Sequence, residues 1–148
     1  YEIGVPCFCA SGNDGGAVDY PASYPETISC GGIDKNKYRA GFSSYGAELD
    51  LVAPAVSVLS LKGKDQYCRM SGTSFSAPFC AGVACLIIAK HRIQEALTGQ
   101  NDAIGVEAIK WHLTKYATPG GSIAEVGRSN EFGFGVVNPV GSVEDENK

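Results

Sequence analysis

The sequence predicts an α/β fold built on a mostly parallel sheet. Glu2–Ser11 carries a short apolar run ended by polar and glycine residues, which is typical of a buried parallel strand, and Ile28–Ile33 predicts a second strand. Within Arg69–His91 a polar turn opens directly onto an apolar helix that can press onto such a sheet. At 148 residues with 44% apolar content, the chain suits one core and is too short for two ordinary domains.

Composition and charge argue against two classes of partner. The net charge is −4 and the pI is near 5.1, whereas a nucleic-acid-binding protein needs a basic face. The longest apolar run, Phe79–Ala89, is well short of a membrane span. We therefore expect neither nucleic acid nor a membrane as a partner.

The six cysteines are expected to be mostly free core thiols. Cys7 and Cys9 lie two apart on an expected strand, and Cys80 and Cys85 lie in the expected helix, so neither spacing suits a disulfide. None forms a C-x₂-C metal-binding pair, and buried cysteine commonly behaves as a small apolar residue. Free thiols favour a reducing compartment without excluding secretion.

The remaining elements follow in chain order. Pro6 is tolerated only near the start of the first strand, and a proline-fixed loop, Tyr20–Pro25, precedes the second. Val56–Leu61 and Gln66–Met70 predict the two strands of a ribbon that leads into the polar turn. Beyond the helix we expect a loop at 91–102 and a surface helix at 104–116. A last strand region at 132–139 is implied only by the family resemblance described below.

The long helix is expected to begin at Ser74 and to be buried on every side. Pro78 is tolerated there only in the first turn. Small residues form one face and large apolar residues fill the rest of the circumference: Ala77, Ala81, Gly82 and Ala84 on the first, and Val83, Leu86, Ile87 and Ile88 on the second.

Ser74 lies at the expected N-terminus of the helix, a position that favours nucleophilic catalysis. Backbone N–H groups are unpaired at a helix N-terminus and the helix dipole stabilises negative charge, which suits an attacking serine oxygen beside a developing oxyanion. Gly72 lets the backbone come close to a substrate. The alternative is that Ser74 is only the N-cap of a core helix.

The residues around Ser74 resemble a known family. Ser71-Gly72-Thr73-Ser74, followed by Ala77-Pro78 and Ala81-Gly82, resembles the nucleophile segment of the subtilisin-like serine peptidases. The G-x-S-x-G elbow of α/β-hydrolases does not fit, because position 76 is serine. The resemblance implies that Ser74 is the nucleophile and Ser76 is not, and that the fold is the three-layer subtilisin-like one.

A second segment resembles the oxyanion-binding loop of that family. Ser11-Gly12-Asn13-Asp14-Gly15 is similar to the family's A-G-N-x-G pattern, whose asparagine donates to the oxyanion. Asn13 carries an uncharged NH₂ that can point at developing charge without needing a proton of its own. The resemblance therefore gives Asn13 a catalytic role, with the Ser74 N–H as the second donor.

The resemblance covers residues 1–139 but only the later half of the family's catalytic domain, and 140–148 is expected to be a frayed acidic tail. Such a serine needs an imidazole as base and a carboxylate to orient it, yet no D-T/S-G or H-G-T-H pattern occurs. His91 lies 17 residues beyond Ser74, about 25 Å along a helix, and His112 lies on a later helix. We expect the Asp and His on an N-terminal half outside this sequence, so that this chain alone is inactive.

Substrate-binding residues follow from the same resemblance. The walls of the P1 pocket would be Ala10-Ser11-Gly12 and the segment Asp14–Tyr20, with Asp14 at the rim and Thr73 beside the nucleophile. Asp19 falls where the pocket floor should be, and a carboxylate there would attract a cationic side chain. We expect a preference for Arg or Lys at P1 of a polypeptide substrate; the alternative is a solvated turn residue.

No cofactor is needed for the chemistry, but members of the family often hold a cation near the Y-P-x-x-Y-P loop. Hard oxygen ligands suit calcium or sodium, and an exposed acidic loop is the alternative. By position the ligands would be the carbonyls of Ala22, Tyr24 and Thr27 with the carboxylates of Glu48 and Asp50.

The leading hypothesis is thus a serine endopeptidase acylated at Ser74. The alternative is an inactive subtilisin-like pseudoenzyme that binds a protein partner. Departures from the family pattern keep it open, because Phe75 and Phe79 replace the usual methionine and histidine, although neither removes a catalytic atom. A nucleotide-binding domain is set aside, since no helix-opening third glycine follows Gly133-Phe134-Gly135.

Overall fold

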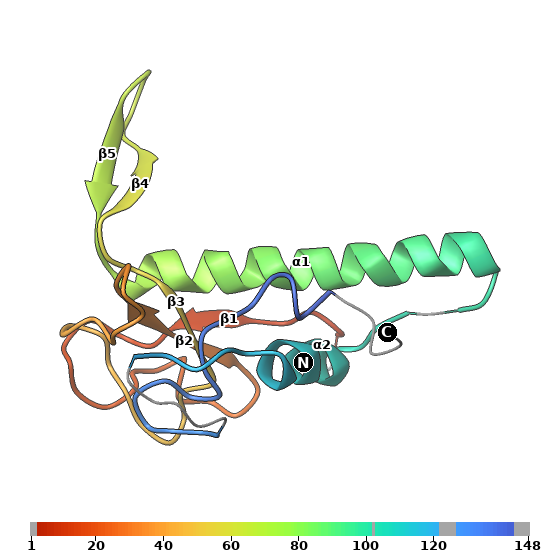
Figure 1. Ribbon diagram of the computed structural model, residues 1–148, viewed down its shortest axis with the longest axis horizontal. Coiled ribbons are helices and arrows are strands. Elements are labelled where there is room, and N and C mark those ends of the chain that lie inside the picture. Colours follow the sequence, from red (N-terminus) through yellow and green to blue (C-terminus); the bar gives the residue numbers. More distant parts are fainter. Residues whose placement is uncertain (1–2, 102, 122–126, 144–148) are drawn as a thin grey trace.

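A parallel sheet of three strands lies at the centre of the molecule, so the predicted α/β class is confirmed. The computed structural model describes residues 3–101, 103–121 and 127–143. The sheet has the order β1 (Phe8–Ala10), β2 (Ile28–Ile33), β3 (Leu51–Pro54), with all neighbours parallel (Figure 1). β1 is shorter than the expected strand: residues 3–7 lie outside the sheet, and Pro6 among them has no N–H to donate to a ladder.

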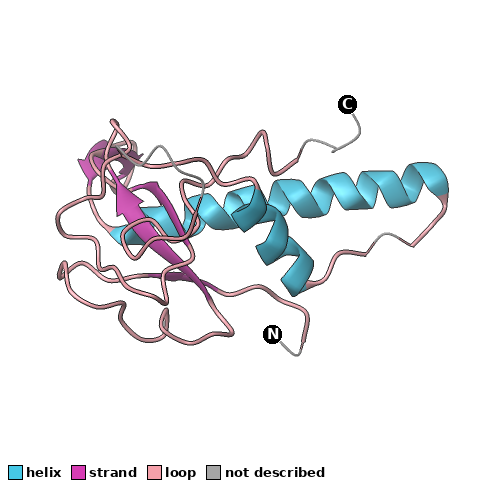
Figure 2. Ribbon diagram, turned by 60° about the horizontal axis from the view of Figure 1, so that its bottom comes forward, coloured by secondary structure: helices cyan, strands magenta, loops and turns pink. Residues whose placement is uncertain are grey.

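Both helices pack on one face of the sheet. α1 (Thr73–Thr98) contacts all three strands, and α2 (Val106–Lys115) lies alongside α1 (Figure 2). The core between them is formed by fully or nearly fully buried side chains from the strands and both helices: Ile28, Cys30, Leu51, Ala53, Cys80, Val83, Ala84, Ile87, Ile109 and Leu113. Apolar residues therefore fix the start of α1 at the carboxyl ends of the strands.

The other face of the sheet is covered by loops. Val18, Ala22, Leu49 and Phe132 pack there with Val52 in a second buried cluster. The expected last strand region forms only bridges, in which Val136 pairs with Val52 and with Thr118. The start of the expected frayed tail, 140–148, is packed against the molecule. Ser142 is buried and Val143 packs against the helix-side core, whereas 144–148 lie outside the described residues.

α1 is longer than the sequence analysis predicts. It continues through 91–98, which we expected to be a loop, and ends at Gly99, whose φ of 69° is left-handed and whose N–H donates to the Glu95 carbonyl at 2.9 Å. The polar residues of this stretch are strong helix formers, so their polarity indicates an exposed helix rather than a loop. Pro78 lies in the second turn and not the first, so the Ser74 carbonyl lacks the usual i+4 donor.

The burial expected for α1 is also wrong. Its buried residues are Thr73, Ser76, Cys80, Val83, Ala84 and Ile87, all on the side of the sheet. Large apolar side chains on the other side are open, with Phe79 42%, Leu86 51% and Ile93 60% exposed. Among the described residues α1 is also the one helix long and apolar enough to cross a membrane by length and composition, a test that core helices of soluble proteins pass as well.

The predicted ribbon is confirmed. β4 (Val58–Leu61) and β5 (Tyr67–Met70) pair antiparallel and project from the sheet beside the start of α1 (Figure 1). Its side chains are largely exposed, including Leu61 at 74% and Tyr67 at 70%. The ribbon leads straight into the turn before Ser74, as expected.

All six cysteines are free. Cys30 and Cys80 are buried thiols as predicted, and the hydrogen bond with Cys80, together with burial, raises the pKa of Cys30 well above its ordinary value. The expectation of a core location is wrong for Cys7 and Cys85, which are exposed. Like Leu86, Cys85 is exposed because it lies on the side of α1 that faces away from the sheet.

Candidate active site

Ser74 is the second residue of α1 and its side chain is exposed. The N-cap residue is Gly72, which has no side chain to form a capping bond, so Ser74 is not the N-cap. The turn is fixed from both sides, because the Gly72 N–H donates to the Ala55 carbonyl at 2.9 Å and the Ser57 N–H donates to Ser71 Oγ at 2.9 Å. This backbone presents Ser74 at the open N-terminus of the helix, where its own N–H points outward.

Asn13 follows β1 and reaches this helix N-terminus across the end of the sheet. Its Oδ1 accepts the Thr73 backbone N–H at 2.9 Å and the Thr73 hydroxyl at 3.1 Å. A backbone N–H can only donate, so the atom it meets must be the carbonyl oxygen of the amide. The Nδ2 end, with its two donors, is thereby directed away from Thr73.

The Asn13 amide and the Ser74 N–H lie close together at this helix N-terminus. A Cβ built on Gly72 would lie 3.7 and 3.8 Å from Asn13 Oδ1 and Nδ2 and 3.9 Å from the Ser74 nitrogen. Gly72 leaves this position open, and its φ of 153° disfavours any side chain there. Two uncharged donors, Asn13 Nδ2 and the Ser74 N–H, therefore lie near one another and near the exposed serine.

The second serine of the segment has a structural role. Ser76 is fully buried, and its Oγ donates to the Ala53 carbonyl of β3 at 3.1 Å. No substrate can reach a hydroxyl in that position, which agrees with the expectation that Ser76 is not the nucleophile.

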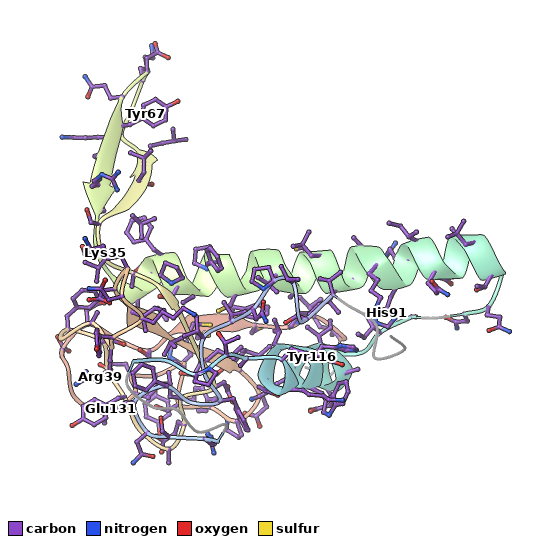
Figure 3. All side chains as sticks on the ribbon, in the orientation of Figure 1. Lys35, Arg39, Tyr67, His91, Tyr116 and Glu131 are labelled. Carbon is purple, nitrogen blue, oxygen red and sulfur yellow. The ribbon has the colours of Figure 1, made fainter. Side chains whose placement is uncertain are left out.

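The two histidines of the chain lie together and far from Ser74. His91 is on α1, about 25 Å from Ser74 at a rise of 1.5 Å per residue, and its ring centroid is 5.7 Å from that of His112 on α2. Figure 3 shows His91 on the part of α1 that is remote from the ribbon. Burial and the positive charges of His91, Lys90 and Lys115 lower the pKa of His112. Neither histidine can serve as the base for Ser74.

The expected pocket walls are held firmly by the segment that follows β2. Ser11 is buried, its Oγ donates to the Ser44 carbonyl at 3.0 Å, and the Ser44 N–H donates back to the Gly12 carbonyl at 3.1 Å. The Gly15 N–H donates to the Phe42 carbonyl at 2.8 Å. The loops expected to face the substrate are therefore anchored to the segment that follows β2.

The expected substrate-binding residues divide into three groups. Asp14 and Asp19 are exposed, and Ala10 and Gly12 are half-buried. The Asp19 carboxylate lies directly against Gly12, in the place that a Gly12 side chain would occupy, and Ser44 Oγ is 2.7 Å from the same point. Thr73 is fully buried, and its hydroxyl oxygen lies 3.1 Å from Asn13 Oδ1 and 3.3 Å from the Gly12 carbonyl, which share its one proton. Thr73 therefore acts on the site through Asn13.

The residues expected to bind a cation have other partners. Thr27 Oγ1 lies 3.1 Å from the Ala22 carbonyl and 2.9 Å from the Tyr24 carbonyl, and its one proton bonds an oxygen of this pair. Lys110 of α2 donates to the Thr27 carbonyl at 3.2 Å and to Asp50 Oδ2 at 3.0 Å. The donor set does not fit a bound metal, since an ammonium already lies between two of the five expected ligands. Lys110 is a residue that the sequence analysis missed, and no local pattern marks it.

The sequence matches the model of the Subtilase family over residues 3–135. It is 34% identical over 143 residues to subtilisin DY of Bacillus licheniformis, covering 93% of this chain and 46% of that protein. Identity is 39% over 136 residues to M-protease of Shouchella clausii, covering 91% and 32%, and 38% over 136 residues to subtilisin Savinase of Lederbergia lenta, covering 91% and 45%. The chain spans less than half the length of these curated relatives.

The fold is also similar to those of solved protease structures. The prenylagaramide maturation protease PagA superposes with a TM-score of 0.79 at 27% identity, covering 96% of this chain and 50% of that one. The self-cleaved protease domain of PatA superposes with a TM-score of 0.78 at 24% identity, with the same coverage, and supports the fold alone.

Proposed function

The chain belongs to the subtilase family, and we propose that it supplies the nucleophile and the oxyanion hole of a serine endopeptidase. Its subtilisin-like α/β fold is consistent with this. The observation that carries the proposal is that the Asn13 amide, held through Oδ1 by the Thr73 N–H, lies beside the Ser74 N–H at the helix N-terminus where the Ser74 side chain is exposed. Donors placed in advance around a developing oxyanion stabilise the transition state more than the ground state.

In the proposed reaction Ser74 Oγ attacks the carbonyl carbon of the scissile peptide while an imidazole removes its proton. The carbonyl oxygen becomes an oxyanion between Asn13 Nδ2 and the Ser74 N–H. The C–N bond then breaks, the imidazole returns the proton to the leaving amine, and water later hydrolyses the acyl-enzyme on Ser74. The imidazole and its carboxylate partner would come from the N-terminal half of the same catalytic domain, because neither His91 nor His112 is in reach.

The open side of α1 supports this arrangement. Phe79, Leu86, Ile93 and Leu97 form an exposed apolar row on a helix whose other side is in the core. Single apolar residues at a surface are ordinary, but a continuous row indicates a covered surface. The match covers 46% and 45% of two relatives, and in the proposed arrangement the N-terminal half of the catalytic domain would cover this row.

Cys85 gives a direct test of this cover. In the full protein, we expect native Cys85 to react with a maleimide at least about 10-fold more slowly than an exposed thiol, although it is exposed in this chain alone. Labelling would be mapped by mass spectrometry, with a cysteine placed at exposed Lys35 as the reactive standard and buried Cys80 as the protected one. A native Cys85 that reacts as fast as the Lys35→Cys standard would show that α1 is uncovered.

A fluorophosphonate separates the peptidase from the pseudoenzyme. Applied to the full protein, it should form an adduct at Ser74 and at no other serine, because only an activated serine attacks it. A folded full protein that is unlabelled at Ser74 would rule out the peptidase and leave the protein-binding pseudoenzyme.

We further propose that the enzyme prefers Arg or Lys at P1. The Asp19 carboxylate lies against Gly12, which is one of the expected pocket walls, and the loop that carries it is anchored by an Asp19 N–H bond to the Ser11 carbonyl at 2.9 Å. A carboxylate in this position would pair with a cationic side chain, whereas an apolar side chain would gain no such bond and would displace water from the exposed charge.

Replacement of Asp19 tests this preference. In Asp19→Ser we expect the ratio of kcat/KM for Arg over Phe at P1 to fall about 10- to 100-fold, since a charged hydrogen bond contributes roughly 1.5–3 kcal/mol. Matched peptides that differ only at P1 would be used, with Asp14→Ser as the control at the pocket rim. A parent enzyme that prefers Phe or Leu, or a ratio that Asp19→Ser leaves unchanged, would contradict the proposal.

A further inference from the structure

Subtilases often hold a cation near the loop that contains Tyr24, and the fit of this chain's residues to such an ion is poor. We propose that the ammonium of Lys110 takes the place of that cation, so that this part of the domain is stabilised by its own side chain and not by bound calcium or sodium. The inference does not depend on catalysis, and its failure would leave the proposed function untouched.

The position of the ammonium is the first support. Lys110 Nζ bonds the Thr27 carbonyl at 3.2 Å and Asp50 Oδ2 at 3.0 Å, and these two oxygens belong to the set expected to hold the metal. Lysine donates through up to three N–H groups, so it can join oxygens that would otherwise face one another. The Lys110 side chain is 20% exposed and that of Asp50 8%, so the pair is largely removed from water.

The other expected ligands are also in use. The Thr27 hydroxyl lies 3.1 Å from the Ala22 carbonyl and 2.9 Å from the Tyr24 carbonyl, so its one proton already bonds an oxygen of the expected ligand set. The Glu48 carboxylate is folded over Gly46, whose Cβ position lies 2.8 Å from Glu48 Oε2. A calcium ion would need six or more oxygen ligands, and Lys110 Nζ already bonds two of the five oxygens expected here.

The charge around this site is already balanced. The cavity beside Asp50 is lined by two acidic side chains, Glu48 and Asp50, and by two basic ones, Lys110 and Arg128. The Arg128 guanidinium donates to the carbonyls of Ala47 and Leu49, the latter at 3.4 Å. These two carbonyls flank Glu48, so Arg128 binds the backbone of the segment that carries the acidic residues. A divalent cation entering here would meet two positive charges, and repulsion would weaken its binding.

The bond between Lys110 Nζ and Asp50 Oδ2 helps to hold three parts of the fold together. Asp50 Oδ2 also accepts the Ser29 N–H at 2.9 Å, so one carboxylate joins the start of β2, the segment entering β3 and, through Lys110, helix α2. Lys110 and Thr27 are 83 residues apart in the sequence. Loss of the ammonium should therefore loosen contacts among three elements at once.

The experiment measures the melting temperature of the full protein with excess chelator, with excess calcium chloride and with excess sodium chloride, at constant ionic strength. Lys110→Ala should melt roughly 5 °C lower than the parent in chelator, because it leaves the Asp50 carboxylate unpaired. It should also recover part of this loss in calcium or sodium, because the vacated oxygens can now take an ion. Asp50→Asn added to Lys110→Ala should remove that recovery.

Two control variants sharpen the result. Lys35→Ala, which removes an exposed lysine, should leave both the melting temperature and its ion dependence unchanged. Lys110→Arg should keep a cation at the site and should not gain ion dependence, which provides a measurement even if Lys110→Ala fails to fold.

Three results would overturn the proposal. The first is a Lys110→Ala protein that melts with the parent. The second is a Lys110→Ala protein that is less stable but gains no response to calcium or sodium. The third is a parent protein whose own calcium response disappears in Asp50→Asn, since Asp50 would then be a metal ligand beside the intact lysine.

Discussion

Replacing Ser74 with alanine in the full protein is expected to lower kcat by about 10⁶-fold, the size of effect known for the nucleophile of subtilisin itself. Ser74 Oγ would be the only atom that bonds to the substrate, so nothing else in the site can replace it. The residual rate should come from the oxyanion hole and substrate binding alone. The measurement is kcat on a peptide substrate, together with loss of the fluorophosphonate adduct.

Ser76→Ala is the matched control, two residues further along the same helix. Ser76 Oγ is buried and donates to the Ala53 carbonyl, so its removal should cost about 1 kcal/mol of unfolding free energy and leave kcat within a few-fold. The opposite pattern, with activity lost in Ser76→Ala and kept in Ser74→Ala, would show that Ser74 is not the nucleophile.

The sequence was sufficient for the local elements of this site. The serine falls at the start of α1, and the ribbon and the strand at Ile28–Ile33 appear where the apolar pattern predicts them. Each depends on a short stretch of chain, because apolar periodicity and turn residues act over a few positions. The resemblance of two short segments added the pairing of Asn13 with Ser74, which lie 61 positions apart.

The burial of α1 could not be predicted in the same way. An all-apolar circumference indicates a helix covered on every side, but it does not say which chain segment provides the cover. Here the sheet and α2 cover one side, and Leu86 and Ile93 remain open on the other. The length of α1 did have a signal, since Gly99 follows a run of strong helix formers and can adopt the left-handed conformation that ends a helix.

Long-range polar contacts gave no signal at all. Lys110 is one basic residue on a helix that the apolar stripe predicts to lie at the surface, and its bond to Thr27 exists only because α2 folds back beside the start of β2. Thr73 is similar, because its burial and its hold on Asn13 follow from the packing of α1 against the sheet. Such contacts depend on tertiary geometry and not on residue spacing.

The position of Thr73 sharpens the prediction for Asn13. Asn13→Asp keeps the oxygen that accepts the Thr73 N–H but replaces the Nδ2 donor with a second oxygen, so the fold of the loop should survive while the oxyanion loses its donor. We expect kcat to fall by at least about 10²–10³-fold, a magnitude taken from loss of the same donor in subtilisin. A negative charge beside the oxyanion can only increase the loss.

The loss of activity in Asn13→Asp should appear in kcat, with KM nearly unchanged. The bond from Asn13 Nδ2 would form only as negative charge develops on the substrate oxygen. Thr73→Val provides the graded comparison. It removes the hydroxyl bonds to Asn13 and Gly12 but keeps the Thr73 N–H, so the amide should be held less firmly and kcat should fall only about 10-fold. Circular dichroism and melting temperature would show that each variant is folded. A rise in KM at constant kcat in Asn13→Asp would place Asn13 in ground-state binding, and an unchanged kcat would remove it from the oxyanion hole.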